Sequence, residues 1–259
     1  MKPLGTTINY NYQLLTVLAK TSTAALQGLN AIPVIVEADN FDDGHNQKCT
    51  IVGLPDGAVR ESQDRILSAL RTNGYKTPGN SIVINLSPAD IRKEGSGFDL
   101  PIAVALLISY NLLTIHQSEQ YMFVGELSLD GTVLPVKGIL PISIKARELG
   151  LKALFVPEDN AREAAVVNNL TVYGVKHLNE IVAHFSGLNQ LQPTIVNTRE
   201  EFYAQQFTFP YDFDEVKGQE NVKRAFEVAS AGGHNILLVG SPGCGKSMMA
   251  KRLPSILPP

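Results

Sequence analysis

The 259-residue chain contains no tryptophan and only two cysteines, Cys49 and Cys244. These two lie far apart in the sequence and fall in different expected domains. A disulfide framework requires a set of cysteines, and a zinc site requires further Cys or His ligands at short spacing. Neither pattern is present, so the sequence predicts neither kind of site and favours a reducing compartment, the cytoplasm.

An excess of charge of one sign is also missing, because the formal net charge is only −3. A nucleic-acid-binding surface would therefore have to be a local basic patch. Arg92, Lys93 and Lys137 are candidates for such a patch, and ordinary solvated surface charge is the competing interpretation. With 44% hydrophobic and 18% charged residues, the composition is typical of a globular protein.

Long hydrophobic runs are absent as well. The longest apolar stretch, residues 100–113, is too short to cross a bilayer and contains Asn111. Residues 1–12 lack an apolar segment behind a basic start, so we expect no secretory signal there. The stretch at 100–113 predicts a buried helix, and no membrane partner is expected.

What the sequence does contain is the phosphate-binding template G-x-x-x-x-G-K-[ST]. Eight consecutive residues match it: Gly240, Ser241, Pro242, Gly243, Cys244, Gly245, Lys246 and Ser247. An apolar run at 236–239 precedes the template and a helix-compatible stretch at 246–253 follows it. In this context backbone N–H groups at the helix start point at the phosphate oxygens of a bound ligand. Lys246 is expected to reach the β- and γ-phosphates, and the Ser247 hydroxyl to bind Mg²⁺.

Elsewhere, strand-like and helix-like segments alternate, which predicts an α/β fold with a mixed sheet. Expected strands cover 34–37, 49–52, 82–86, 121–128, 132–136, 153–156 and 171–175, with a hairpin turn at Asp130-Gly131. Expected helices cover 55–73, 100–110, 138–149 and 161–167, and one more ends at 185. We expect a first domain over residues 1–185, a linker over 186–210 and a second unit over 211–259.

Several helix starts are suggested by capping residues. Ser87-Pro88 resembles the beginning of a helix, with a hydroxyl cap and a proline in the first turn. Asp56, Asp90 and Asp99 are interpreted as caps at or near helix starts, rather than as catalytic acids.

Several separate motifs resemble the ComM/YifB family, whose members are AAA+ ATPases related to the ATPase subunit of magnesium chelatase. The resemblance rests on residues 51–56, 93–101, 125–131, 212–219, 231–235, the phosphate-binding template and residues 251–259. It extends over nearly the whole chain from about residue 14. It implies that the first domain has the fold of ribosomal protein S5 domain 2, shared with the proteolytic domain of Lon, and that a P-loop AAA+ module begins after the linker.

The Lon-like fold raises a peptidase as one alternative. Lon-type domains use a Ser–Lys dyad, because the hydroxyl needs a neighbouring amine to accept its proton. Laying the Lon-type motifs on this sequence puts Gly97 at the nucleophile position and Leu140 at the lysine position. Ser96 and Lys137 stand close to these positions but out of register. We therefore expect no peptidase activity.

The family resemblance implies an ATP-driven motor that acts on DNA by branch migration during recombination or natural transformation. Such motors form homo-oligomeric rings, usually hexamers. A magnesium-chelatase ATPase subunit is a weaker alternative, because that subunit would begin near residues 212–219.

The remaining alternative is a non-catalytic fragment, since the chain ends twelve residues after the template. Phosphoryl transfer also needs an acidic Walker B strand and an arginine finger, and the resemblance implies that both lie further on. A single parallel strand has no neighbours to pair with, so we expect residues 211–259 to be poorly ordered if made alone.

Overall fold

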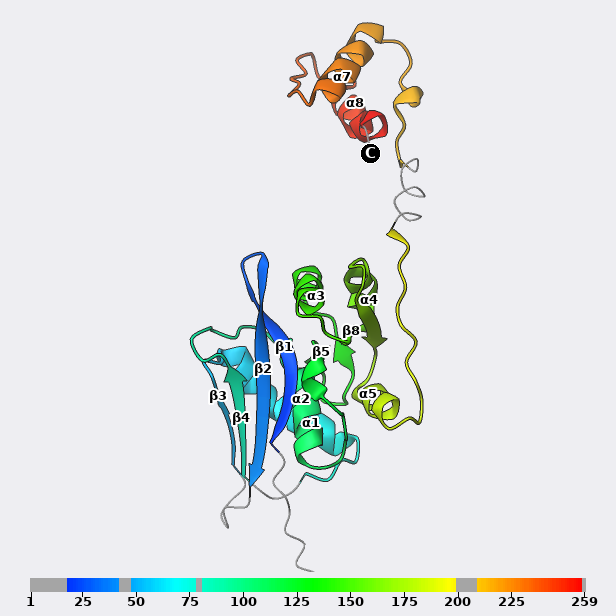
Figure 1. Cartoon of the computed structure of the whole chain (residues 1–259). Coiled ribbons are helices and arrows are strands. Elements are labelled where there is room, and N and C mark those ends of the chain that lie inside the picture. Colours follow the sequence, from blue (N-terminus) through cyan, green and yellow to red (C-terminus); the bar gives the residue numbers. More distant parts are fainter. Residues whose placement is uncertain (1–17, 42–47, 78–80, 199–208, 258–259) are drawn as a thin grey trace, which may run out of the picture. The chain divides into compact units, whose positions relative to one another are not determined.

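A computed structural model describes residues 18–41, 48–77, 81–198 and 209–257 (Figure 1). The predicted loop around 41–48 and part of the predicted linker lie largely outside these ranges. The chain divides into two compact units, with the boundary between Val196 and Asn197.

A mixed seven-stranded sheet forms the centre of the first unit, with the strand order β3-β4-β2-β1-β5-β8-β9. The strands are β1 (Ala19–Gln27), β2 (Asn30–Phe41), β3 (Cys49–Val52), β4 (Ser81–Ser87), β5 (Tyr121–Phe123), β8 (Ala153–Pro157) and β9 (Thr171–Val175). Strand β2 pairs antiparallel with β1 and β4, whereas the other four pairings are parallel. The α/β expectation is therefore confirmed.

Helices cover both faces of this sheet (Figure 1). They are α1 (Gly57–Thr72), α2 (Asp99–Ser109), α3 (Ile139–Glu148), α4 (Glu158–Ala165) and α5 (Leu178–Phe185). Helices α1, α2 and α5 bury their apolar residues in one core with the sheet, and α3 and α4 do so in a second core. Helix α2 is buried almost all round, as expected for a helix that is apolar on every side.

The predicted hairpin is present as a separate two-stranded sheet, β6 (Glu126–Leu127) and β7 (Val133–Leu134). Its turn contains Gly131 at φ 93°, a left-handed conformation that glycine adopts without strain. A Cβ on Gly131 would lie 2.6 Å from the Asn73 side-chain nitrogen. The hairpin tip is held against α1, because Asn73 donates from Nδ2 to the Asp130 carbonyl over 2.7 Å.

The helix predicted from Ser87-Pro88 is wrong. After β4 the chain makes turns and an isolated bridge between Lys93 and Pro55. The Lys93 N–H donates to the Leu54 carbonyl, and the Asp56 N–H donates to the Lys93 carbonyl. Because these backbone groups bond to the loop before α1, they are not available for a helical ladder.

The three predicted aspartate caps have different outcomes. Asp56 caps α1, since its Oδ1 accepts from the Val59 N–H over 2.8 Å. Asp90 begins no helix. Asp99 is the first residue of α2 but does not cap it; the cap position is Phe98, and the Asp99 carboxylate is buried in an ion pair with Arg65.

Residues 186–196, which we interpreted as linker, form the end of the first unit. The Thr194 N–H donates to the Val172 carbonyl of β9 over 2.8 Å, and Leu191 packs against the main core. The Leu191 N–H donates to His184 Nδ1 over 3.1 Å. This segment therefore runs beside the last strand of the sheet.

The second unit contains η2 (Phe213–Glu215), α7 (Glu220–Gly232), α8 (Lys246–Arg252) and η3 (Leu253–Ile256). Four residues form its buried core: Phe213, Val216, Phe226 and Met249. Arg252 forms an ion pair with Glu215, which ties α8 to η2. The helix predicted over 246–253 is confirmed with nearly the same bounds.

The strand predicted over 236–239 is not formed. The segment has no assigned secondary structure, and Leu237 and Val239 are 86% and 87% exposed. A strand needs a ladder of hydrogen bonds to a neighbour, and the part of the second unit that the structure describes offers none. The apolar pattern of residues 236–239 is therefore not enough to form a strand without a pairing partner.

In the described parts of the chain, every helix is too short or too polar to span a bilayer.

Candidate functional site

The phosphate-binding template forms a tight loop that leads directly into α8. Gly243 and Gly245 have φ values of 84° and 87°, and Gly245 is the N-cap of the helix. A side chain at either position would be strained by this backbone conformation. A Cβ on Gly240 would lie 2.9 Å from the Cys244 Sγ, so the loop is closely folded on itself.

Backbone donors gather at the end of this loop. The first helical hydrogen bond of α8 runs from the Met249 N–H to the Gly245 carbonyl. Among the residues that the structure describes, the N–H groups of Gly245, Lys246 and Ser247 have no hydrogen-bond acceptor. Free N–H groups at a helix start carry partial positive charge, so this end of the loop suits an anion.

Lys246 lies across the mouth of the loop. Its Nζ donates to the carbonyls of Gly240 and Ser241, over 2.8 and 2.7 Å, and lies 3.6 Å from the Cys244 Sγ. The Ser247 side chain is exposed at the start of the helix. The ammonium, the hydroxyl and the unpaired N–H groups are thus brought together, and this donor set fits a nucleoside triphosphate with Mg²⁺.

Among the described residues, no carboxylate forms a hydrogen bond or an ion pair with this donor set. No group of three or more His, Cys, Asp or Glu side chains suitable for a metal occurs in the described ranges. The nearest interaction from outside the loop is a long one, in which Gln219 Nε2 donates to the Cys244 carbonyl over 3.4 Å. The described loop therefore offers hydrogen-bond donors to phosphates, and the exposed Ser247 hydroxyl is its group of a kind that suits a metal ion.

A second candidate site is a cavity of about 320 Å³ in the first unit. Ser96, Gly97 and Lys137 all line it, so the structure brings the region of the Lon-type motifs together. Leu140 is not among the lining residues and is 38% exposed. Ser96 Oγ donates to the Glu126 carboxylate rather than to an amine. No hydrogen bond joins Ser96 to Lys137 among the described residues, so no Ser–Lys dyad is assembled.

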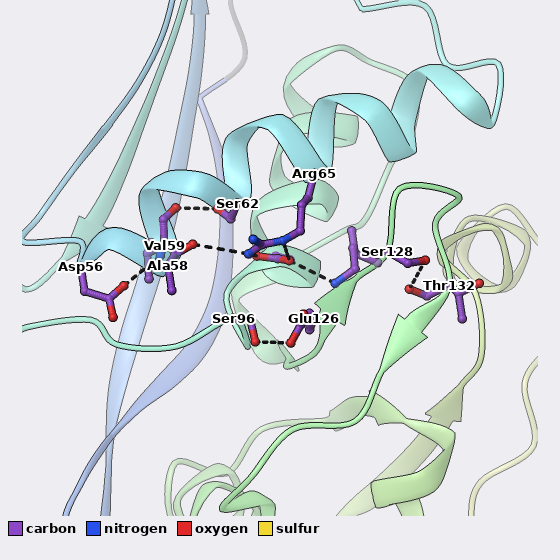
Figure 2. Close-up of polar contacts among 11 residues, drawn as sticks. Asp56, Ala58, Val59, Ser62, Arg65, Ser96, Glu126, Ser128 and Thr132 are labelled. Carbon is purple, nitrogen blue, oxygen red and sulfur yellow. Dashed lines mark hydrogen bonds and ion pairs between the residues drawn. The ribbon is translucent and has the colours of Figure 1, made fainter.

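Beside this cavity lies a buried ion pair that we did not predict from the sequence (Figure 2). Arg65 on α1 donates from Nε and Nη2 to the two carboxylate oxygens of Asp99, over 2.9 and 3.1 Å. The Leu127 N–H of the hairpin donates to the same carboxylate over 3.1 Å. Asp99 is completely buried, so the pair joins α1, α2 and the hairpin. The sequence signal that could have indicated this ion pair is an acidic residue at the start of an otherwise apolar helix.

Burial raises the pKa of Asp99, and the hydrogen bonds from Arg65 and Leu127 act in the opposite direction. The pKa of Arg65 is also raised, chiefly by its hydrogen bonds to Asp99. A guanidinium with a raised pKa stays charged, so it is a permanent partner for the carboxylate. The arrangement is structural: it fixes the hairpin that carries Glu126.

Lys93 is buried as well, and its Nζ donates to the Pro88 carbonyl. Burial lowers the pKa of this ammonium, while the nearby Asp90 raises it. The interpretation of Lys93 as surface charge is therefore wrong, and so is its place in a DNA-facing patch with Arg92 and Lys137. The long side chain reaches back across the turn that follows β4 and fastens it.

Comparison with known proteins adds two kinds of match. Residues 36–160 match a family model described as subunit ChlI of Mg-chelatase, and residues 212–259 match a second model, magnesium chelatase, subunit ChlI. The chain is 40% identical over 245 residues to the uncharacterized protein YifB of Salmonella typhimurium, covering 93% of this chain and 46% of YifB. It is 38% identical over 241 residues to competence protein ComM of Haemophilus influenzae, covering 93% and 47%.

The chain belongs to the ComM/YifB family. This confirms the resemblance drawn from the sequence motifs, and the two ChlI matches support an ATPase family of the AAA+ type. The chain spans about half the length of the ComM and YifB proteins that it matches. A more distant relative is Lon protease from Brevibacillus choshinensis. It is 28% identical over 149 residues, and the alignment covers 53% of this ComM/YifB-family chain and 19% of the Lon protease.

Proposed function

We propose that this chain binds ATP with Mg²⁺ through the loop from Gly240 to Ser247, as part of an AAA+ motor of the ComM/YifB type. The observation that carries the proposal is the loop itself: two left-handed glycines, unpaired N–H groups at a helix start, and the Lys246 ammonium at the mouth. Family membership supports it, because residues 36–160 and 212–259 both match models of the ChlI subunit of magnesium chelatase, which is an ATPase of the AAA+ type.

Each group of the loop has a separate task. The N–H groups of Gly245, Lys246 and Ser247 donate to phosphate oxygens, and the start of α8 favours their negative charge. Lys246 exchanges its two carbonyl partners for the β- and γ-phosphates. Ser247 provides a hydroxyl ligand for the metal. When bound, Mg²⁺ neutralises phosphate charge and holds the phosphates in one orientation.

For the whole protein, we propose a homo-oligomeric ring, a hexamer in the manner of its class, that works on DNA in the cytoplasm. Branch migration during recombination or natural transformation is the activity we favour, because one relative, ComM of Haemophilus influenzae, is named a competence protein. The first unit, with its mixed sheet and its distant match to Lon protease, is proposed to have the ribosomal S5 domain 2 fold.

The test of nucleotide binding is a titration of the 259-residue protein with a fluorescent ATP analogue in the presence of Mg²⁺. We expect saturable binding that Lys246→Ala weakens by at least tenfold, because the phosphates lose their side-chain cation. Lys251→Ala is the matched control, since it removes an exposed lysine from the same helix. Equal affinity of the two variants, or no binding by the parent protein, would contradict the proposal.

A further inference from the structure

The cavity of the first unit opens where two neighbouring strands separate. Strand β1 pairs with β2 along its whole length, from Ala19 to Gln27, but it pairs with β5 only at Ser22. Beyond Ser22 the place beside β1 is occupied by the cavity of about 320 Å³. Ala24 and Leu26 of β1 line the cavity, and Val136 and Lys137 line it too.

The backbone of β1 faces this space with its hydrogen-bonding groups. Ala24 stands opposite Pro33 in β2. Proline has no N–H, so this antiparallel pair suits the kind that exchanges no hydrogen bonds. The N–H and C=O groups of Ala24 then point away from β2, and so do those of Leu26, because alternate residues of a strand point to the same edge. The carbonyl of Lys20, which has the same parity, accepts from Ser118 on that edge.

These outward groups have no partner within the described ranges of the chain. In the part of the chain that the structure describes, β1 pairs with β5 at Ser22 alone, and no backbone hydrogen bond joins Ala24 or Leu26 to a residue outside the sheet. Ala24 is only 6% exposed, whereas Leu26 is 40% exposed at the rim. An unpaired strand edge beside a cavity is a template for another extended chain.

The side chains around the edge divide into those with partners and one without. Glu126 is engaged by Ser96, and Glu94 forms an ion pair with Arg92. Within the described residues the Lys137 ammonium has no ion-pair or hydrogen-bond partner. The walls between these charges are apolar and include Leu26, Val136 and Ile142. The cavity therefore offers backbone donors and acceptors, an apolar pocket and one uncommitted positive charge.

We propose that this cavity binds an extended peptide segment of a partner protein, which pairs with the edge of β1 at Ala24 and Leu26. An apolar side chain of the peptide packs against Val136 and Ile142, and a neighbouring carboxylate binds Lys137. The bound peptide is held and not cleaved, since Ser96 has a carboxylate and not an amine as its hydrogen-bond partner. The site lies in the first unit and does not depend on nucleotide binding.

The first experiment titrates a fluorescein-labelled peptide, Thr-Val-Thr-Val-Asp-Thr, with the 259-residue protein and follows fluorescence anisotropy. Two further peptides carry N-methyl groups on alternate amides, one set on the even and the other on the odd positions. Strand pairing uses only one of these sets, so we expect one peptide to lose about tenfold or more in affinity and the other to bind like the parent. Absence of binding at millimolar concentration, or equal affinity of both methylated peptides, would overturn the proposal.

The second experiment changes the protein. Leu26→Pro removes an edge N–H that β2 does not use, so the fold should persist while peptide affinity falls about tenfold. Lys137→Gln should weaken binding of the aspartate-containing peptide, and Lys176→Gln, at an exposed lysine outside the cavity, should not. Should Leu26→Pro fail to fold, the methylated peptides still decide the question. Undiminished affinity in folded Leu26→Pro would count against pairing at this edge.

Discussion

The two units of the chain bury their apolar residues to different degrees. In the first, seven strands are covered on both faces, and helices α2 and α1 bury whole apolar surfaces. In the second, four buried residues hold together two helices and the loop from Gly240 to Ser247, while Leu237 and Val239 stay almost fully exposed. The difference shows that a binding loop can be shaped locally by glycines and a helix start, whereas a strand requires neighbours.

The largest expected effect is a difference in amide hydrogen-exchange rates between the two units. Amides of β2 and β8, which have a neighbouring strand on each side, should exchange only on global unfolding of the first unit, for which about 5–15 kcal/mol is typical. Amides at 236–239 should exchange almost freely, because they lack strand partners. Mass spectrometry of the 259-residue protein after deuterium labelling measures both. Strong protection at 236–239 would remove the contrast between the units.

The next effect tests how the first unit holds its buried charge. Arg65→Ala leaves the Asp99 carboxylate buried with only the Leu127 N–H as partner, so we expect a loss of about 3–5 kcal/mol in unfolding free energy. Urea denaturation followed by circular dichroism measures it.

Two variants sharpen this test. Arg60→Ala removes an exposed arginine from the same helix and should change stability by less than about 0.5 kcal/mol. Adding Asp99→Asn to Arg65→Ala should restore part of the loss, because the unpaired charge is then gone. A double variant as unstable as the single one would show that packing, and not charge, is the cause.

The smallest effect concerns the aromatic cluster where α5 and residues 186–196 meet the sheet. The His184 ring packs against Phe155, Tyr173 and Phe185, and burial lowers its pKa below the ordinary value of 6.5. Between the two pKa values the unfolded chain binds more protons than the folded one. Stability from this group is therefore fully present above pH 6.5 and is lost as the pH falls toward the folded-state pKa.

Protonation would also cost the hydrogen bond from the Leu191 N–H, because Nδ1 would then carry a proton itself. Thermal unfolding between pH 7.5 and pH 5, taken as rough limits around the free histidine pKa, should show a modest decrease that His184→Phe flattens. An unchanged pH dependence in that variant would assign the decrease to other groups.

Sequence reasoning placed most regular elements of the first unit, because their apolar periodicity agrees with their final burial. It failed where a tertiary contact decided the outcome. The turn after β4 depends on Lys93 reaching Pro88, and Asp99 is a buried ion-pair partner because Arg65 lies opposite on α1. Neither pairing follows from local spacing. The loop residues 240–247 were found directly, since the template is contiguous, and their role in nucleotide binding stays a prediction.

The course of the chain beside β9 has a consequence for association. A last strand with bare backbone groups invites the strands of other molecules, and stacking of that kind leads to aggregates. Here the Thr194 N–H donates to the Val172 carbonyl. The segment that follows α5 therefore covers part of this edge of the sheet. The opposite border, β3, is only four residues long. Within its described ranges, the first unit thus offers little outer edge for strand pairing between molecules, and the unpaired backbone groups of Ala24 and Leu26 lie beside the cavity.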